Sequence, residues 1–286
     1  TGKGSFQDCS NLSTVIFPQL LTFGESLFEN CISLQDITLN QNLTDVSERG
    51  FYNCQKLVSI HLPIKNIPKE CFSNCISLKN IDLPNAQHVG DLSFYNCNSL
   101  EQFSSHIIED IGYSAFAECT SLKSIYLYSL LTIDYDKLFY NCQSLTHISL
   151  PVLSKVNQEC ENIFGNCTSL QWVGLPSVEP NKFAENTFLN TNNKQSNEEG
   201  VYITLCLPYR SDYNDYLQNS NKWKGILLKS YPHNYFLECF EITKEKEPSN
   251  YTRNVTIIIF VVAIVLISVI LIIYRRYKKA KERKNG

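Results

Sequence analysis

Residues 111–127 read IGYSAFAECTSLKSIYL, and the apolar spacing of this stretch recurs along most of the chain. Within it a Phe is followed, at intervals of three residues, by a Cys, a Leu and an Ile. Eight such units occur if Ile, Val or Phe is accepted at the last position, and they begin at Phe6, Phe28, Phe51, Phe72, Phe94, Phe116, Phe139 and Phe164. Self-similarity at this period predicts a solenoid, in which each unit buries its apolar side against its neighbours.

Each unit is expected to contain one short β-strand. Two residues after the Ile or Val comes another apolar residue in seven of the eight units, as at Leu62 and Leu127. Apolar residues two apart lie on the same face of a strand. Proline lacks an N–H and ends a strand, and it follows in five units, at Pro18, Pro63, Pro84, Pro151 and Pro176. Stacked units would therefore form a parallel sheet with these apolar side chains turned inward.

Glycine recurs in the segment that precedes the Phe of a unit. It stands at the same repeat position at Gly2, Gly24, Gly90 and Gly112. Because glycine adopts positive φ without steric cost, we expect the backbone at these positions to have a φ that other residues resist.

The form F-x-x-C-x-S-L-x-x-I-x-L-P, with I-G-x-x-A-F upstream, resembles the BspA-like, or Treponema-type, leucine-rich repeats, and residues 111–122 match it almost throughout. The resemblance covers about two thirds of the chain. It departs from the pattern at Ser105 and at an insertion that carries Cys160. It implies an α/β leucine-rich repeat solenoid, with a parallel β-sheet on the concave face and a C-terminal cap. It also implies adhesion to host cells, matrix proteins or other microbes.

The twelve cysteines fall into two groups. Eight hold the same position in the eight units, between Phe and Leu, so stacking should place them in one interior column of reduced thiols. Cys71 is expected in the core as well, and Cys160 lies outside the column. Cys206 and Cys239 are the pair considered for a disulfide. Since neither C-x-x-C nor H-x(3–5)-H spacing occurs, we expect no metal site and no cofactor.

Residues 255–274 are uncharged and rich in Ile, Val and Leu, and twenty helical residues span about 30 Å, the thickness of a hydrocarbon core. They predict one transmembrane helix. Residues 275–286 contain seven Lys or Arg and one Glu, which predicts a cytoplasmic tail by the positive-inside rule. The rest of the chain is expected to consist of a repeat array over 1–189 and a C-terminal cap with a juxtamembrane spacer over 190–254.

The predicted orientation places the repeats outside a plasma membrane that the chain crosses once. Seven of the 25 basic and one of the 28 acidic residues lie in 275–286, so the rest of the chain carries a net charge of −9. Such a surface disfavours nucleic acid as a partner. The glycosylation candidates are Asn42, Asn11 and Asn250. A cytosolic array on a C-terminal anchor is the alternative, which the basic tail disfavours. No signal peptide is visible and the chain contains no methionine, so we expect the natural protein to begin upstream of Thr1.

The binding surface is expected on the concave face, where residues beside the inward-facing Ile and Leu vary from unit to unit. Tyr126 and Trp172, taken to be exposed, are the expected energetic anchors because large aromatic side chains dominate many interfaces. The candidate binding residues are Asp36, Thr38, Ser59, His61, Asn80, Asp82, Tyr126, His147 and Trp172.

The sequence favours binding over catalysis. Its five histidines lie in different units, and it contains neither a nucleophile elbow nor a glycine-rich phosphate loop. We therefore expect a surface protein, not an enzyme, that binds a protein or glycan on another cell or in a matrix. Two other hypotheses stay open at this point, a receptor-like sensor that signals through a cytoplasmic partner and a structural coat protein.

Overall fold

The computed structural model describes residues 2–175, 183–184, 186–191, 204–206, 222–223 and 226–227. All of these belong to the first of two compact units, Thr1–Phe236 and Leu237–Gly286. The predicted transmembrane segment 255–274, the tail 275–286, Asn250 and Cys239 lie outside the described residues. Within them, no helix is long and apolar enough to cross a bilayer.

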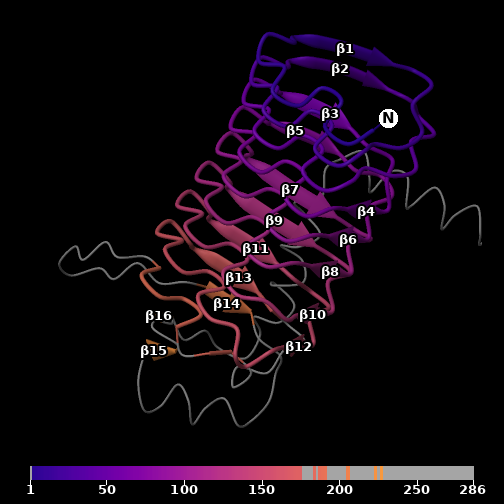
Figure 1. Ribbon diagram of the computed structural model, residues 1–286. Helices are drawn as coiled ribbons and strands as arrows, with labels where there is room; N and C mark the ends of the chain where they lie inside the picture. Colours follow the sequence, from indigo (N-terminus) through magenta and orange to yellow (C-terminus); the bar gives the residue numbers. More distant parts are fainter. Residues whose placement is uncertain are drawn as a thin grey trace, which may run out of the picture. The chain divides into compact units, whose positions relative to one another are not determined.

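The array is a parallel β-solenoid whose first sheet contains one strand from each coil (Figure 1). Equivalent residues of successive coils pair directly, as in Ile60 with Ile81 and Ile125 with Ile148. The strands are β1 (Thr14–Phe17), β2 (Asp36–Leu39), β3 (Ser59–His61), β5 (Asn80–Asp82), β7 (Gln102–Ser105), β9 (Ser124–Leu127), β11 (His147–Ser149), β13 (Trp172–Gly174) and β14 (Thr204–Cys206). Hydrogen bonding is interrupted between β2 and β3 and between β5 and β7. The predicted strand in each unit is confirmed.

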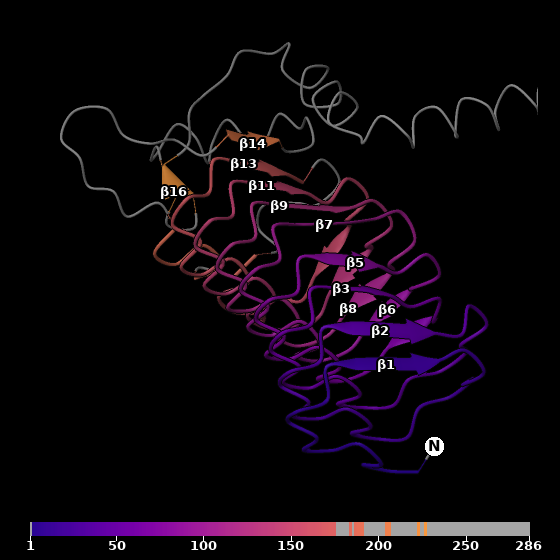
Figure 2. The ribbon, with the colours of Figure 1, turned by 90° about the horizontal axis from the view of Figure 1, so that it is seen from above.

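Shorter strands form a second side of the coils, and Figure 2 shows the stack from a perpendicular direction. They also pair in parallel, as β4–β6–β8 and as β10–β12. Their bounds are β4 (Asn66–Ile67), β6 (His88–Val89), β8 (Asp110–Ile111), β10 (Thr132–Ile133) and β12 (Lys155–Val156). An antiparallel pair, β15 (Lys222–Trp223) and β16 (Ile226–Leu227), follows in the sequence.

The third side of each coil, called the turn side below, consists of turns that precede the first-sheet strand. The α part of the expected α/β class is absent from the described residues, which contain no helix. Two residues of each turn, four positions apart, have positive φ, as at Ser26 (56°) and Asn30 (60°). A right-handed helix requires negative φ throughout, so these turns cannot be helical.

A column of Phe rings forms the centre of the core. Each Phe stacks on its equivalent in the next coil, with ring centroids 5.4 Å apart between Phe51 and Phe72 and 5.5 Å between Phe72 and Phe94. The column continues to Phe188 of a ninth coil, 5.1 Å from Phe164. From Phe28 to Phe188 every ring of the column is fully buried. The apolar repeat thus produces one continuous core.

The predicted thiol column lies beside the rings. Seven of its cysteines, together with Cys71 and Cys160, are buried, whereas Cys9 in the first coil is exposed. The ten cysteines between Cys9 and Cys167 are all free. Each of the seven buried thiols of the column donates a hydrogen bond to the carbonyl of the Phe one coil earlier, as Cys97 Sγ does to Phe72 O at 3.2 Å. Burial raises the pKa of the Cys75 thiol to about 12, so the interior thiols stay protonated and unreactive at neutral pH.

The glycine prediction is corrected by the backbone. Of the described glycines only Gly4 has positive φ (61°), and it occupies the repeat position of Ser26. Gly90 and Gly112 are needed for close approach between coils instead. A Cβ at Gly90 would lie 2.7 Å from Lys69 N, and one at Gly112 would lie 2.6 Å from Asp91 N. These contacts involve backbone atoms, so a side chain at either position would require the neighbouring coil to shift.

Candidate functional site

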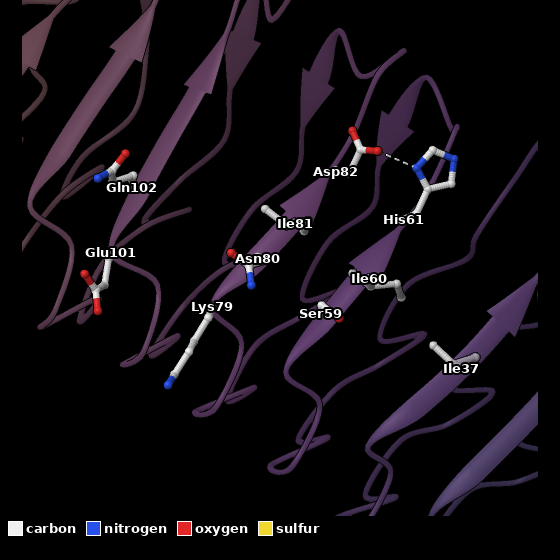
Figure 3. Close-up of a pocket in the computed structure, with 10 residues that line it drawn as sticks. All are labelled: Ile37, Ser59, Ile60, His61, Lys79, Asn80, Ile81, Asp82, Glu101 and Gln102. Atoms are coloured by element: carbon white, nitrogen blue, oxygen red, sulfur yellow. Dashed lines mark hydrogen bonds and ion pairs between the residues drawn. The ribbon is translucent and has the colours of Figure 1, made fainter. Parts of the chain in front are cut away.

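The first sheet carries a depression of about 810 Å³ that spans four coils (Figure 3). Side chains of β3 and β5 form most of its surface, and residues at the start of β7 and in β2 complete it. The lining residues are Ile37, Ser59, Ile60, His61, Lys79, Asn80, Ile81, Asp82, Glu101 and Gln102. Four of the predicted binding residues therefore share one site.

The depression coincides with the two interruptions of the first sheet. Since β5 and β7 are not hydrogen bonded, Ile81 is only half-buried and forms part of the floor. Phe103 in β7 holds the position that Ile or Val holds elsewhere, and its ring packs against Phe94 and Phe116, at 5.5 and 4.7 Å. The result is an apolar floor surrounded by polar side chains, which is the usual composition of a recognition site.

His61 and Asp82 form the best-defined polar contact of the site. The register pairs these two residues across β3 and β5, and His61 Nδ1 lies 2.6 Å from Asp82 Oδ2. Both side chains are more than half exposed. The aspartate therefore orients the imidazole while the other ring nitrogen stays available to a partner.

Opposite charges line the other end of the depression. Lys79 and Glu101 come directly before β5 and β7, and Lys123 Nζ lies 2.6 Å from Glu101 Oε2. The hydrogen bond from Lys123 lowers the pKa of the Glu101 carboxyl. The site thus offers both signs of charge near an apolar floor, which suits a polar macromolecular surface better than a small apolar ligand.

The structure brings only part of the predicted surface together. Ser59, His61, Asn80 and Asp82 line the depression. The other predicted residues lie elsewhere on the first sheet: Asp36 and Thr38 on β2, where both are exposed, Tyr126 on β9, His147 on β11 and Trp172 on β13. Lys79 and Glu101 were not predicted as binding residues because each lies just before its strand. A charged residue directly after the Leu of the motif is the sequence feature that could have identified them.

The prediction that Trp172 is exposed is wrong, since the residue is only 7% exposed. Its indole folds over the backbone at Gly174, so that a Cβ there would collide with the ring. The His147 ring packs beside the Trp172 indole, with ring centroids 6.3 Å apart. His147 Nδ1 lies 2.9 Å from Thr146 Oγ1. Tyr126 is half-buried, and burial raises the pKa of its hydroxyl. Trp172 thus belongs to the structure of the sheet.

Two of the three glycosylation candidates lie among the described residues. Asn11 and Asn42 are exposed, and Asn42 lies in the turn after β2, where its backbone N–H donates to Asn40 Oδ1 at 2.8 Å. Among the residues that the structure describes, no three His, Cys, Asp or Glu side chains are grouped to hold a metal ion.

Comparison with known proteins gives a family match and several similar folds. A family model described as a BspA type leucine rich repeat region matches residues 1–107 and 87–199, with six copies. A leucine-rich repeat protein from Bacteroides ovatus is 23% identical, with coverage of 75% of this chain and 72% of that one and a TM-score of 0.47. A leucine rich cell surface protein from Faecalibacterium prausnitzii is 17% identical, with coverage of 81% of this chain and 80% of that one and a TM-score of 0.43. The T. pallidum leucine rich repeat protein is 22% identical, with coverage of 59% of this chain and 70% of that one and a TM-score of 0.42. No curated protein sequence matches the chain.

Proposed function

Since the chain belongs to the BspA-type leucine-rich repeat family, whose repeats match residues 1–107 and 87–199, we propose that it is a cell-surface binding protein. Its first sheet binds a protein or glycan on another cell or in a matrix and thereby mediates adhesion. The depression around His61 and Asp82 carries this proposal, because it combines the partly buried side chains of Ile37 and Ile81 with oriented polar groups on a rigid frame.

The sequence supports the surface location. An uncharged apolar segment of helix-spanning length, 255–274, is followed directly by the basic residues of 275–286. This order supports the proposal that residues 1–254 lie outside the cell and the tail lies in the cytoplasm. The net charge of −9 before residue 275 keeps the outer part soluble and favours partners with basic groups.

The proposal predicts that losing the His61–Asp82 pair weakens adhesion. Cells that display the full chain are allowed to attach to epithelial monolayers or to immobilised matrix, and the cells retained under flow are counted. Replacing both residues by Ala, His61→Ala with Asp82→Ala, should lower the apparent affinity about tenfold, as expected for the centre of an interface. Both side chains are solvent-exposed, so the core is untouched.

The chain offers a matched control on its second sheet. His88 Nδ1 lies 2.5 Å from Asp110 Oδ2, across β6 and β8, and neither residue lines the depression. The double variant His88→Ala with Asp110→Ala removes an equivalent exposed pair and should leave adhesion unchanged. Equal adhesion by the His61/Asp82 variant and the wild-type chain would exclude the depression as the binding site.

A further inference from the structure

The turn side carries a second groove, of about 480 Å³, that shares no residue with the depression on the first sheet. The residue directly after the Phe of each unit lines it in five successive coils. Large and small side chains alternate at this position, in the order Tyr52, Ser73, Tyr95, Ala117 and Tyr140. Ser73 and Ala117 are buried whereas the three tyrosines are partly exposed, so rings project on every second coil with a hollow between them.

Backbone hydrogen bonds fix the distance between these coils. The carbonyl of each residue in the alternating series accepts an N–H from the preceding coil. Asn74 N donates to Tyr95 O and Glu118 N donates to Tyr140 O, both at 2.8 Å. Coils bonded in this way are about 4.8 Å apart, as in a β-ladder. Tyrosines two coils apart are therefore separated by about 10 Å along the groove.

The rings at both ends of the series are held in place. Tyr140 OH accepts a hydrogen bond of 2.9 Å from Asn166 Nδ2. The Arg49 guanidinium lies 3.9 Å from the ring centroid of Tyr52, and it also contacts Glu70 Oε2 at 2.6 Å. Such pre-organised aromatic side chains lose little entropy when a partner binds.

Glu118 supplies a negative charge to the groove, whereas the basic residue in its lining, Lys137, lies at the Tyr140 end, 6.0 Å from that ring. Glu118 lines the groove close to Tyr95. The pKa of the Tyr95 hydroxyl is raised, chiefly by burial and also by the Glu118 charge. The Glu118 carboxylate accepts a hydrogen bond from Asn141, which fixes its position and leaves it able to accept from a cationic group as well. A partner that places Arg or Lys at this point gains a charge-assisted hydrogen bond.

We propose that this groove binds a proline-rich segment of a partner protein in the polyproline II conformation, with a basic residue placed at Glu118. A polyproline II helix repeats every three residues and rises about 9 Å per turn, close to the separation of the tyrosine rings. Successive prolines on one face of the helix would enter the hollows at Ser73 and Ala117. Grooves lined with aromatic side chains recognise such segments in several unrelated folds.

Synthetic peptides test this inference on the full wild-type chain in mild detergent. Fluorescence anisotropy compares a labelled twelve-residue peptide of Pro-Pro-Arg repeats with a Gly-Ser-Arg peptide of the same charge. We expect the proline peptide to bind at least about tenfold more tightly. A second pair places proline every third or every fourth residue, and the three-residue period should be preferred because it matches the rings.

Variants locate the binding. Tyr95→Ala should weaken binding of the Pro-Pro-Arg peptide about tenfold or more, whereas Tyr95→Phe keeps the ring and should retain it. Tyr135→Ala, at an exposed tyrosine outside the groove, is the matched control and should have no effect. Glu118→Gln should weaken binding of the Pro-Pro-Arg peptide but not of oligoproline.

Three results would overturn the inference. The first is equal binding of the Pro-Pro-Arg and Gly-Ser-Arg peptides, which would indicate attraction by charge alone. The second is equal affinity for the two proline spacings. The third is binding of a linear oligosaccharide that Tyr95→Ala abolishes while the proline peptides fail to bind, which would assign the groove to glycans. The His61/Asp82 variant should bind the proline peptide normally, so this test is independent of the adhesion experiment.

Discussion

Raising the pH from 9 to 12 is expected to unfold the repeat array steeply. Burial raises the thiol pKa to about 12 in Cys75, Cys119 and Cys167. It holds the thiol pKa well above 9.0 in Cys54, Cys97 and Cys142. In the unfolded chain these thiols ionise above about pH 9, whereas in the folded chain they stay protonated. Their contribution to stability is thus complete below pH 9 and is lost as the pH rises toward the folded pKa.

The expected loss is large because the thiols act together. Each thiol removes about 1.4 kcal/mol of unfolding free energy per pH unit once its unfolded form is ionised. Six thiols therefore remove on the order of 8 kcal/mol per unit, which is comparable to the total stability of a domain. Urea titrations followed by circular dichroism at fixed pH values, with reductant present, measure this slope.

Cysteine variants separate the thiols from the other groups that titrate in alkali. Replacing Cys97 and Cys119 together by Ala should reduce the slope by about 3 kcal/mol per pH unit, because two ionising groups are lost. Cys9→Ala is the matched control, since Cys9 holds the same repeat position but is exposed, and it should leave the slope unchanged. If the unfolding free energy fell with pH at the same slope in the wild-type chain, the Cys97/Cys119 variant and the Cys9 variant, the prediction would be contradicted.

The second large effect is expected from the Phe column. Phe116 is fully buried, and its ring centroid lies 4.9 Å from that of Phe94 and 5.7 Å from that of Phe139. Phe116→Ala should lower the unfolding free energy at pH 7 by about 3–5 kcal/mol, since it removes a buried ring and leaves a cavity between two coils. Urea denaturation at 25 °C gives this value directly.

The first coil supplies a matched substitution. Phe6 occupies the same motif position but is only partly buried, with one stacked neighbour in the column, Phe28 at 5.6 Å. Phe6→Ala should therefore lower the unfolding free energy by less than about 2 kcal/mol, because solvent can fill the space and fewer contacts are lost. If the two variants were equally destabilised, the ring column would not hold the coils together.

The strands and the core could be predicted from sequence because the same constraint acts in every coil. The Ile, Val or Phe position after the motif Leu fell on a first-sheet strand in all eight units, and the Phe that begins each unit contributed to the ring column. An asparagine also stands two residues after the Phe in six of the eight units. Asn30, Asn53 and Asn74 all have φ near 60°, a conformation that asparagine tolerates better than most residues.

The site was less predictable because it depends on departures from the repeat. Phe103 replaces Ile or Val beside the missing hydrogen bonds between β5 and β7, but this replacement alone does not predict that Ile81 stays only half-buried and lines a depression. The orientation of Trp172 follows from the absence of a side chain at Gly174, two residues later. Exposure of a strand residue therefore cannot be predicted from alternation alone when a neighbouring glycine leaves space for its ring.

Alkylation of the thiols is the most direct test that the coils stack around a closed interior, on which both binding surfaces depend. The native full chain is treated at pH 7.5 with an impermeant maleimide, and each cysteine is followed by peptide mass mapping. We expect rapid modification of Cys9 and no modification of Cys54, Cys75, Cys97, Cys119, Cys142 and Cys167 until the chain is unfolded in urea. Modification of these six thiols at the rate of Cys9 in the native chain would contradict the stacked interior.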